Sequence, residues 1–203
     1  MGFYALAADC NGRLYAGGTF SDLDGNSSAN FAYLDGGVWH SMTNATGKGV
    51  TGIVRSLATS GTNVYVGTDA LDLGGSPQAD HVAKWNGSSW SALSSKGSTD
   101  GWFPSSSYIY ALMPYGAGLY AGGSFTNAGG DPLADRIAFY DGKGWVPVGS
   151  NGAGDGPLNG TVNALAISSK TLYAGGNFTS AGGNPAAQHI VSVPLPPMPL
   201  GAH

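Results

Sequence analysis

Two histidines and a neighbouring aspartate are the first candidates for metal chemistry. His81 follows Asp80, and His189 occupies the same place relative to a pair of glycines, where Arg136 stands in the copy between them. A zinc site needs three or four His, Cys or carboxylate ligands, and no cysteine or further carboxylate lies at a suitable spacing. We therefore interpret this position as a repeated polar contact at the start of a strand, and we predict neither a metal nor a cofactor.

The segment Asp22-Leu23-Asp24-Gly25-Asn26 partly resembles a calcium-binding loop. It lacks the third acidic position before the glycine and the distal glutamate that such loops use. The corresponding segments 127–131 and 180–184 have the composition of turns, so a turn is sufficient here as well. Asp22, Asp24 and Asp131 are kept as candidates for partner-binding loops.

No set of catalytic residues can be assembled from the sequence. A nucleophile with its base, a G-x-S-x-G elbow and a glycine-rich phosphate loop are all missing. A glycosidase would need a pair of carboxylates on converging loops, and nothing in the spacing argues for one. We predict a protein that is not an enzyme; the alternative is a propeller-fold hydrolase or lyase that acts on a carbohydrate.

Two further features bear on recognition at the surface. Trp102 and Phe103 lie in a Gly/Ser-rich stretch, where aromatic side chains either bind a sugar or protein or fill a gap beneath the loop. Candidate N-glycosylation sequons are more frequent than chance predicts, which fits an extracellular surface. They are Asn26, Asn44, Asn86, Asn159 and Asn177.

These candidates sit on a unit that occurs four times. The segments LYAGGTF (14–20), VYVGTDA (64–70), LYAGGSF (119–125) and LYAGGNF (172–178) are copies of one motif. Their tyrosines, Tyr15, Tyr65, Tyr120 and Tyr173, are 50, 55 and 53 residues apart, and a glycine follows each tyrosine after ten residues. Three copies end in Asp-Gly or Asn-Gly and a tryptophan, at Trp39, Trp90 and Trp145. These tyrosines and tryptophans are the predicted anchors of the repeat.

Each copy is predicted to form four antiparallel strands, A to D. Strand A contains YALA or its equivalent, strand B is LYAGG, strand C ends in the Asp-Gly type of hairpin turn, and strand D begins at the tryptophan. The paired glycines after strand B permit positive φ and a close approach of the backbone. In such a unit the B–C and D–A loops share one end, which we predict to be the functional face.

A double glycine, a tyrosine-bearing strand and a tryptophan within about 50 residues resemble the kelch motif. The YAGGxF form is similar to repeats of secreted surface proteins related to galactose-oxidase-type propellers. The resemblance implies an all-β protein, a β-propeller of four kelch-like repeats. The copper site of that family is not carried over, because no Tyr–Cys and paired-His set is evident. Copy 4 departs from the pattern, since it has no tryptophan and runs into Val193-Pro194-Leu195-Pro196-Pro197. Its strand D is therefore predicted to be absent or irregular.

Composition narrows the class of partner. Only 10% of residues are charged and the net charge is −4, which argues against nucleic acid. No apolar stretch is long enough for a membrane span, and no signal peptide is visible. Cys10 stands alone and forms no internal disulfide.

We predict a single repeat domain, 1–203, with repeats at about 1–52, 53–107, 108–160 and 161–195 and a Pro-rich tail at 196–203. The expected function is binding or assembly of a protein or glycan at an extracellular or cell-surface location. Four blades are at the lower limit for a propeller, and the last one lacks a strand. We therefore expect self-association, or membership of a larger assembly or longer chain.

Overall fold

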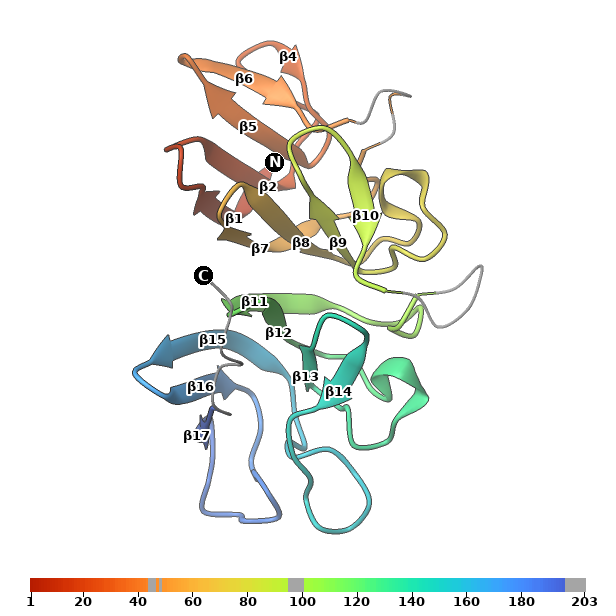
Figure 1. The fold of residues 1–203 in the computed structure, drawn as a ribbon, viewed down its shortest axis with the longest axis vertical. Coiled ribbons are helices and arrows are strands. Elements are labelled where there is room, and N and C mark those ends of the chain that lie inside the picture. The colour runs from red at the N-terminus through yellow and green to blue at the C-terminus, as the bar shows by residue number, and fades with distance from the viewer. Residues whose placement is uncertain (44–46, 48, 95–100, 196–203) are drawn as a thin grey trace. The chain divides into compact units, whose positions relative to one another are not determined.

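The computed structural model describes residues 1–43, 47, 49–94 and 101–195 (Figure 1). The chain forms two compact units, Met1–Gly101 and Trp102–His203, and each carries two of the four larger antiparallel sheets. Helix is limited to two short 3₁₀ turns in the described residues, η1 (Leu73–Gly75) and η2 (Ala128–Gly130). The predicted all-β class, with four antiparallel sheets of three or four strands, is confirmed.

The first unit contains the sheets of repeats 1 and 2. The first sheet has the order β1-β2-β5-β6, which is the order of the chain, and the second runs β7-β8-β9-β10. Along the chain, a small hairpin of β3 and β4 lies between β2 and β5, which pair with each other in the sheet. The strands are β1 (Gly2–Ala8), β2 (Leu14–Thr19), β3 (Asp22–Leu23), β4 (Asn26–Ser27), β5 (Phe31–Asp35), β6 (Val38–Ser41), β7 (Val54–Ser60), β8 (Asn63–Thr68), β9 (Val82–Trp85) and β10 (Trp90–Ala92).

The second unit contains repeats 3 and 4. Its sheets have the orders β11-β12-β13-β14 and β15-β16-β17, so the last sheet has three strands in the described part of the chain. This is the outcome that the missing tryptophan and the prolines of copy 4 predict. The strands are β11 (Ile109–Tyr115), β12 (Gly118–Gly123), β13 (Ile137–Tyr140), β14 (Trp145–Pro147), β15 (Val162–Ser168), β16 (Thr171–Gly176) and β17 (Ile190–Pro194).

The glycine pair that ends strand B allows close packing of the next sheet and does not form a turn. Positive φ was predicted there, but Gly17 and Gly122 are extended and lie within β2 and β12. Each faces strand A of the following repeat, so that a Cβ on Gly17 would overlap Val54 and one on Gly122 would overlap Val162. Glycine is required at these positions because neighbouring sheets approach each other closely.

A different repeated glycine, which follows each tyrosine after ten residues and lies in the B–C connection, does adopt positive φ. Its φ is 78°, 78°, 75° and 76° in the four repeats, at Gly25, Gly75, Gly130 and Gly183. These residues turn the B–C connection back towards strand C, which explains why no copy shifts this spacing.

The repeated aromatic residues lie in the cores, with two exceptions. Tyr15, Tyr65 and Tyr120 are buried, as are Trp90 and Trp145. Trp39 is half-buried beside a small cluster of Phe20, Leu23 and Ala32. Tyr173 of the last repeat is exposed.

Candidate functional site

The position that holds His81, Arg136 and His189 has the same backbone conformation and the same backbone hydrogen bonds in every repeat. Each of these residues has positive φ immediately before strand C, and Asn30 does the same in repeat 1. The backbone N–H of each residue donates to the carbonyl of the second residue after the glycine pair or its equivalent. Its own carbonyl accepts an N–H from the end of strand B. The four N–H bonds go to Phe20, Ala70, Phe125 and Phe178 at 2.8–3.0 Å, and the four carbonyls accept from Gly18, Thr68, Gly123 and Gly176 at 2.9–3.0 Å.

The side chains at this position differ in exposure. His81 is fully buried, and Arg136 Nη1 donates to the carbonyl of Ser124 at 2.8 Å. His189 is exposed, with Nδ1 3.2 Å from the carbonyl oxygen of Gly176. They are not brought together as ligands. Among the residues that the structure describes, no three His, Cys, Asp or Glu side chains form a group that could hold a metal ion.

The aspartate before this position fastens two loops in repeat 2. Asp80 is buried, and its two carboxylate oxygens accept the N–H groups of Asp72 at 3.1 Å and Gly101 at 2.9 Å. It therefore joins the B–C loop to the chain that leaves strand D. The Ala-Asp pair before strand C, which repeats 2 and 3 share, is the sequence signal for this role.

Asp135 is the equivalent residue in repeat 3, and it lies next to a second carboxyl. Its Oδ1 accepts the N–H of Asn127 at 2.6 Å, and the side chain of Asp155 hydrogen-bonds to it. Burial raises the pKa of Asp135, and the hydrogen bond with Asp155 raises it further, while the N–H of Asn127 and the charge of Arg136 lower it. This carboxyl pair was not predicted from the sequence, because the two residues belong to different loops.

The predicted partner-binding residues lie apart. Asp22 and Asp24 are exposed at the β3–β4 hairpin in the first unit. Asp131 is half-buried after η2, and its Oδ1 accepts the N–H of Leu133 at 2.9 Å. Phe103 is buried against Phe125 and Trp145, with ring centroids 4.8 and 4.9 Å apart. For Phe103 the burial favours the alternative that the aromatic ring fills a gap beneath the loop.

The predicted glycosylation sites differ in their surroundings. Asn44 lies outside the described residues, and Asn26 lies in β4. Asn86 and Asn177 are exposed, although Asn86 Oδ1 accepts the N–H groups of two serines that follow it. The side chain of Asn159 is held in a loop contact, since Nδ2 donates to Thr179 Oγ1 at 3.0 Å.

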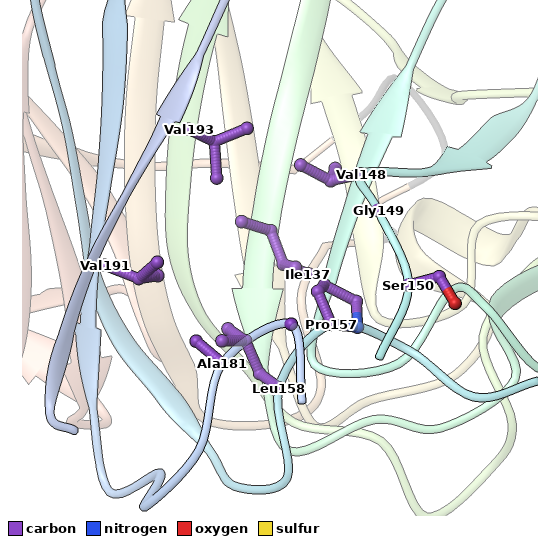
Figure 2. A pocket seen from close by; sticks show the side chains of 10 residues that line it. Ile137, Val148, Gly149, Ser150, Pro157, Leu158, Ala181, Val191 and Val193 are labelled. Carbon is purple, nitrogen blue, oxygen red and sulfur yellow. The ribbon is translucent and has the colours of Figure 1, made fainter. Parts of the chain in front are cut away.

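An apolar pocket opens in the second unit between the sheets of repeats 3 and 4 (Figure 2). Its volume is about 220 Å³, several times the ~30 Å³ that one water molecule occupies in the liquid. Val191 and Val193 of β17 form one wall and Ile137 of β13 faces them, as Figure 2 shows. The rest of the lining comes from two loops: Val148, Gly149, Ser150, Pro157, Leu158, Ala181 and Gly182.

The pocket corresponds to a space that an indole fills in the two preceding repeats. Gly74, Gly129 and Gly182 are equivalent glycines with φ of 64°, 68° and 58°. A Cβ on Gly74 would overlap Trp90 and one on Gly129 would overlap Trp102, whereas a Cβ on Gly182 would have no heavy atom within 4 Å.

The chain itself explains the difference. Gly129 and Gly182 donate their N–H groups to the carbonyls of Trp102 and Pro157 at 2.6 and 2.7 Å, so Pro157 stands where Trp102 stands one repeat earlier. Repeat 4 also lacks the tryptophan of strand D. Both sources of an indole are therefore absent, and the pocket remains.

The edge of β17 lies beside this pocket. β17 pairs with β16 from Ile190 to Pro194, and within the described residues no fourth strand lies on its other side. In repeat 3 the equivalent side of β13 is paired with β14. The arrangement can therefore accept an extended segment on the edge together with a large side chain in the pocket.

No family model matches this chain, and no curated protein matches it. Among solved structures, the chain is similar to the crystal structure of the computationally designed Ika4 protein, with a TM-score of 0.54 and 16% identity over 96% of this chain and 92% of that one. A second similar structure is that of the computationally designed Ika8 protein, with a TM-score of 0.41 and 16% identity, of which this chain spans 43%. The likeness to Ika4 concerns the fold alone. In the described residues no helix is long and apolar enough to cross a membrane.

Proposed function

We propose that this protein is a non-enzymatic binding module, built on kelch-like β-propeller repeats, that captures an extended segment of a partner protein at the edge of β17. The observation that carries the proposal is the apolar pocket around Gly182. In repeats 2 and 3 the same space is filled by Trp90 or Trp102, so the fold already contains the complementary group. The partner segment would supply the aromatic side chain that repeat 4 lacks.

The lining favours a protein over a glycan. The side chains around the pocket are aliphatic apart from Ser150, whereas a sugar needs convergent hydrogen-bonding groups. A volume of about 220 Å³ suits one large side chain rather than a ligand of ~300–1,000 Å³. Backbone hydrogen bonds to β17 would supply the remaining affinity, as in other cases of strand addition.

We place the module at an extracellular or cell surface. The exposed sequons at Asn86 and Asn177 support this location, as does the resemblance to secreted surface repeats.

The alternative, a hydrolase or lyase, has one supporting feature, the pair Asp135–Asp155. Against it, Asp135 is buried and bound to Asn127, as its counterpart Asp80 is bound to Asp72 in a purely structural contact. A substrate screen on the protein and on Asp155→Asn separates the two: turnover that disappears in the variant would favour the enzyme.

The binding proposal is tested with a peptide copied from the chain itself. Residues 88–94 include β10, the strand of repeat 2 whose Trp90 covers Gly74. Methyl NMR shifts of Val191 and Val193 report binding, and we expect the peptide in which Trp90 is replaced by Ala to bind at least tenfold more weakly, which is about 1.4 kcal/mol.

Two variants of β17 provide the control. Val193→Asp places a charge in the pocket and should abolish binding, whereas Ser192→Asp, on the exposed face of the same strand, should leave it intact. Equal binding of the Trp and Ala peptides, or equal loss in both variants, would contradict the proposal.

A further inference from the structure

Neighbouring repeats within each unit are joined by one packing arrangement. In the first unit, Val54 and Leu57 of β7 pack on Gly17 of β2, with Leu57 Cδ1 3.4 Å from the place of a Cβ. In the second unit, Val162 and Leu165 of β15 pack on Gly122 of β12, again with 3.4 Å to Leu165 Cδ1. Strand A thus supplies two apolar side chains, and the preceding repeat supplies a glycine that lets them approach.

The receiving surface also includes a tyrosine and a strand C residue, and the next repeat buries both. Tyr15 and Phe31 surround Gly17 and are each 1% exposed. Around Gly122, Tyr120 is 3% and Ile137 is 1% exposed. We call the equivalent trio in repeat 4, which consists of Tyr173, Gly175 and Ile190, the socket.

The socket is open. Tyr173 is 39% exposed and Ile190 is 66% exposed. A Cβ on Gly175 would meet only the carbonyl oxygen of His189, at 3.7 Å. The last sheet therefore has the surface that receives a strand A, with no strand A on it in the described residues.

The matching donor surface is uncovered at repeat 1. Phe3 and Leu6 of β1 hold the register positions that Val162 and Leu165 hold in β15, because Phe3 pairs with Gly18 as Val162 pairs with Gly176. Phe3 is 52% and Leu6 is 63% exposed, whereas Val54 and Val162 are fully buried. We call Phe3 and Leu6 the plug.

We propose that copies of this chain associate head to tail, with the plug of one copy packed on the socket of a second copy in the arrangement that β15 has on β12. The partner is a second copy because the chain already forms this junction twice between its own repeats. Such a contact is heterologous, so an open assembly of any size keeps one free plug and one free socket, and only the closure of a ring covers both. The inference does not depend on the pocket around Gly182.

The test is the mass of the full chain in solution, measured by light scattering and sedimentation over a range of concentrations. We expect at least two copies per particle for the unaltered protein. Leu6→Glu puts a charge in the plug, and Gly175→Val fills the socket with a side chain whose β-carbon has only the carbonyl oxygen of His189 within 4 Å. Each variant alone should be a monomer, and Val38→Glu, which charges an exposed residue of β6, should keep the mass of the parent.

An equimolar mixture of the two variants is the sharpest measurement. Leu6→Glu copies keep an intact socket and Gly175→Val copies keep an intact plug, so the mixture should recover a particle of two copies and nothing larger. A monomeric parent protein at every concentration would overturn the proposal, including the case in which plug and socket meet within one chain. Variants that keep the parent mass, or a mixture that stays monomeric, would overturn it too. Val193→Asp should leave the mass unchanged, which separates this association from binding at the pocket.

Discussion

The indole of Trp102 lies on the backbone of Gly129 so closely that a β-carbon there would overlap the ring. The glycine in turn donates its N–H to the carbonyl of Trp102 at 2.6 Å. One tryptophan from the preceding loop therefore fixes the B–C turn of repeat 3 by both packing and hydrogen bonding. From the sequence alone Trp102 could bind a partner or fill a gap beneath the loop, and this contact favours the structural role.

Replacement of this glycine should cost more than replacement of its counterpart in repeat 4. Gly129→Ala introduces left-handed strain of about 1–2 kcal/mol and also an overlap with the indole, which typically costs a further 1–3 kcal/mol. Gly182→Ala carries similar strain, since φ is 68° and 58° respectively, but meets no atom. Urea unfolding of the two variants measures the difference directly.

A second substitution identifies the cause. In Gly129→Ala combined with Trp102→Ala the overlap is gone, so the two effects should be less than additive. Strict additivity would show that the ring does not limit the space above Gly129.

The repeat, its strands and the loss of a strand in copy 4 were predictable because each is written in residues that recur at fixed spacing. Asp-Gly and Asn-Gly locate the C–D hairpins, and the prolines after Val193 mark the missing strand. The reason for the first glycine pair was not predictable in the same way. The extended glycine that packs beneath Val54 and a turn glycine such as Gly75 are the same residue type in the sequence. Only the packing of the next sheet shows which of the two roles a glycine has.

Trp90→Ala should destabilise the protein by about 3–5 kcal/mol, the usual cost of removing a buried tryptophan. Its indole packs on Trp85 and on Phe31 of the preceding repeat, with ring centroids 5.1 and 5.7 Å apart, and covers Gly74. Trp39→Ala is the matched control, and because Trp39 is only half-buried it should cost less. An unchanged melting temperature for Trp90→Ala would show that the repeat positions are wrongly assigned to the sheets.

The candidate sites were harder to predict from the sequence than the fold was. The pocket depends on what repeat 4 lacks, and its signal was the absent tryptophan together with Pro157 in the place of Trp102. Asp135 and Asp155 are 20 residues apart on different loops, so no local pattern joins them. The histidine position was correctly assigned to the start of strand C, and its physical basis is a left-handed backbone conformation that all four repeats share.

Asp80→Ala should be far more harmful than Asp131→Ala. Removal of the Asp80 carboxylate leaves the N–H groups of Asp72 and Gly101 without their acceptor, and hydrogen bonds to a charged group contribute about 1.5–3 kcal/mol each. Asp131 accepts one N–H in a half-exposed turn, so its loss should cost about 1 kcal/mol or less. Hydrogen exchange at Gly101 should also rise in Asp80→Ala, and equal stabilities of the two variants would contradict this role.

The free energy of unfolding should depend on pH through Asp135 with a predictable sign. Burial and the Asp155 carboxyl raise the pKa of Asp135 in the folded protein, against the opposing effect of Asn127 and Arg136. A group whose pKa is raised by folding contributes its full stability below the unfolded pKa of about 3.9 and loses it as the pH rises through the folded pKa. Asp135→Asn keeps an acceptor for the N–H of Asn127 and cannot ionise. The stability of the variant relative to the parent should therefore increase as the pH rises from about 4, through the raised pKa of Asp135.

Asp141→Asn is the control, because its stability relative to the parent should fall as the pH rises, which is the opposite direction. The N–H groups of Gly144 and Lys143 lower the pKa of Asp141, so its contribution is present above the unfolded pKa and is lost as the pH falls. Asn86 already accepts two N–H groups in the same way at the equivalent turn of repeat 2, so the substitution is structurally tolerated. Urea unfolding at several pH values measures both variants. A relative stability of Asp135→Asn that falls with rising pH would show that Asp135 is held as a carboxylate and does not share a proton with Asp155.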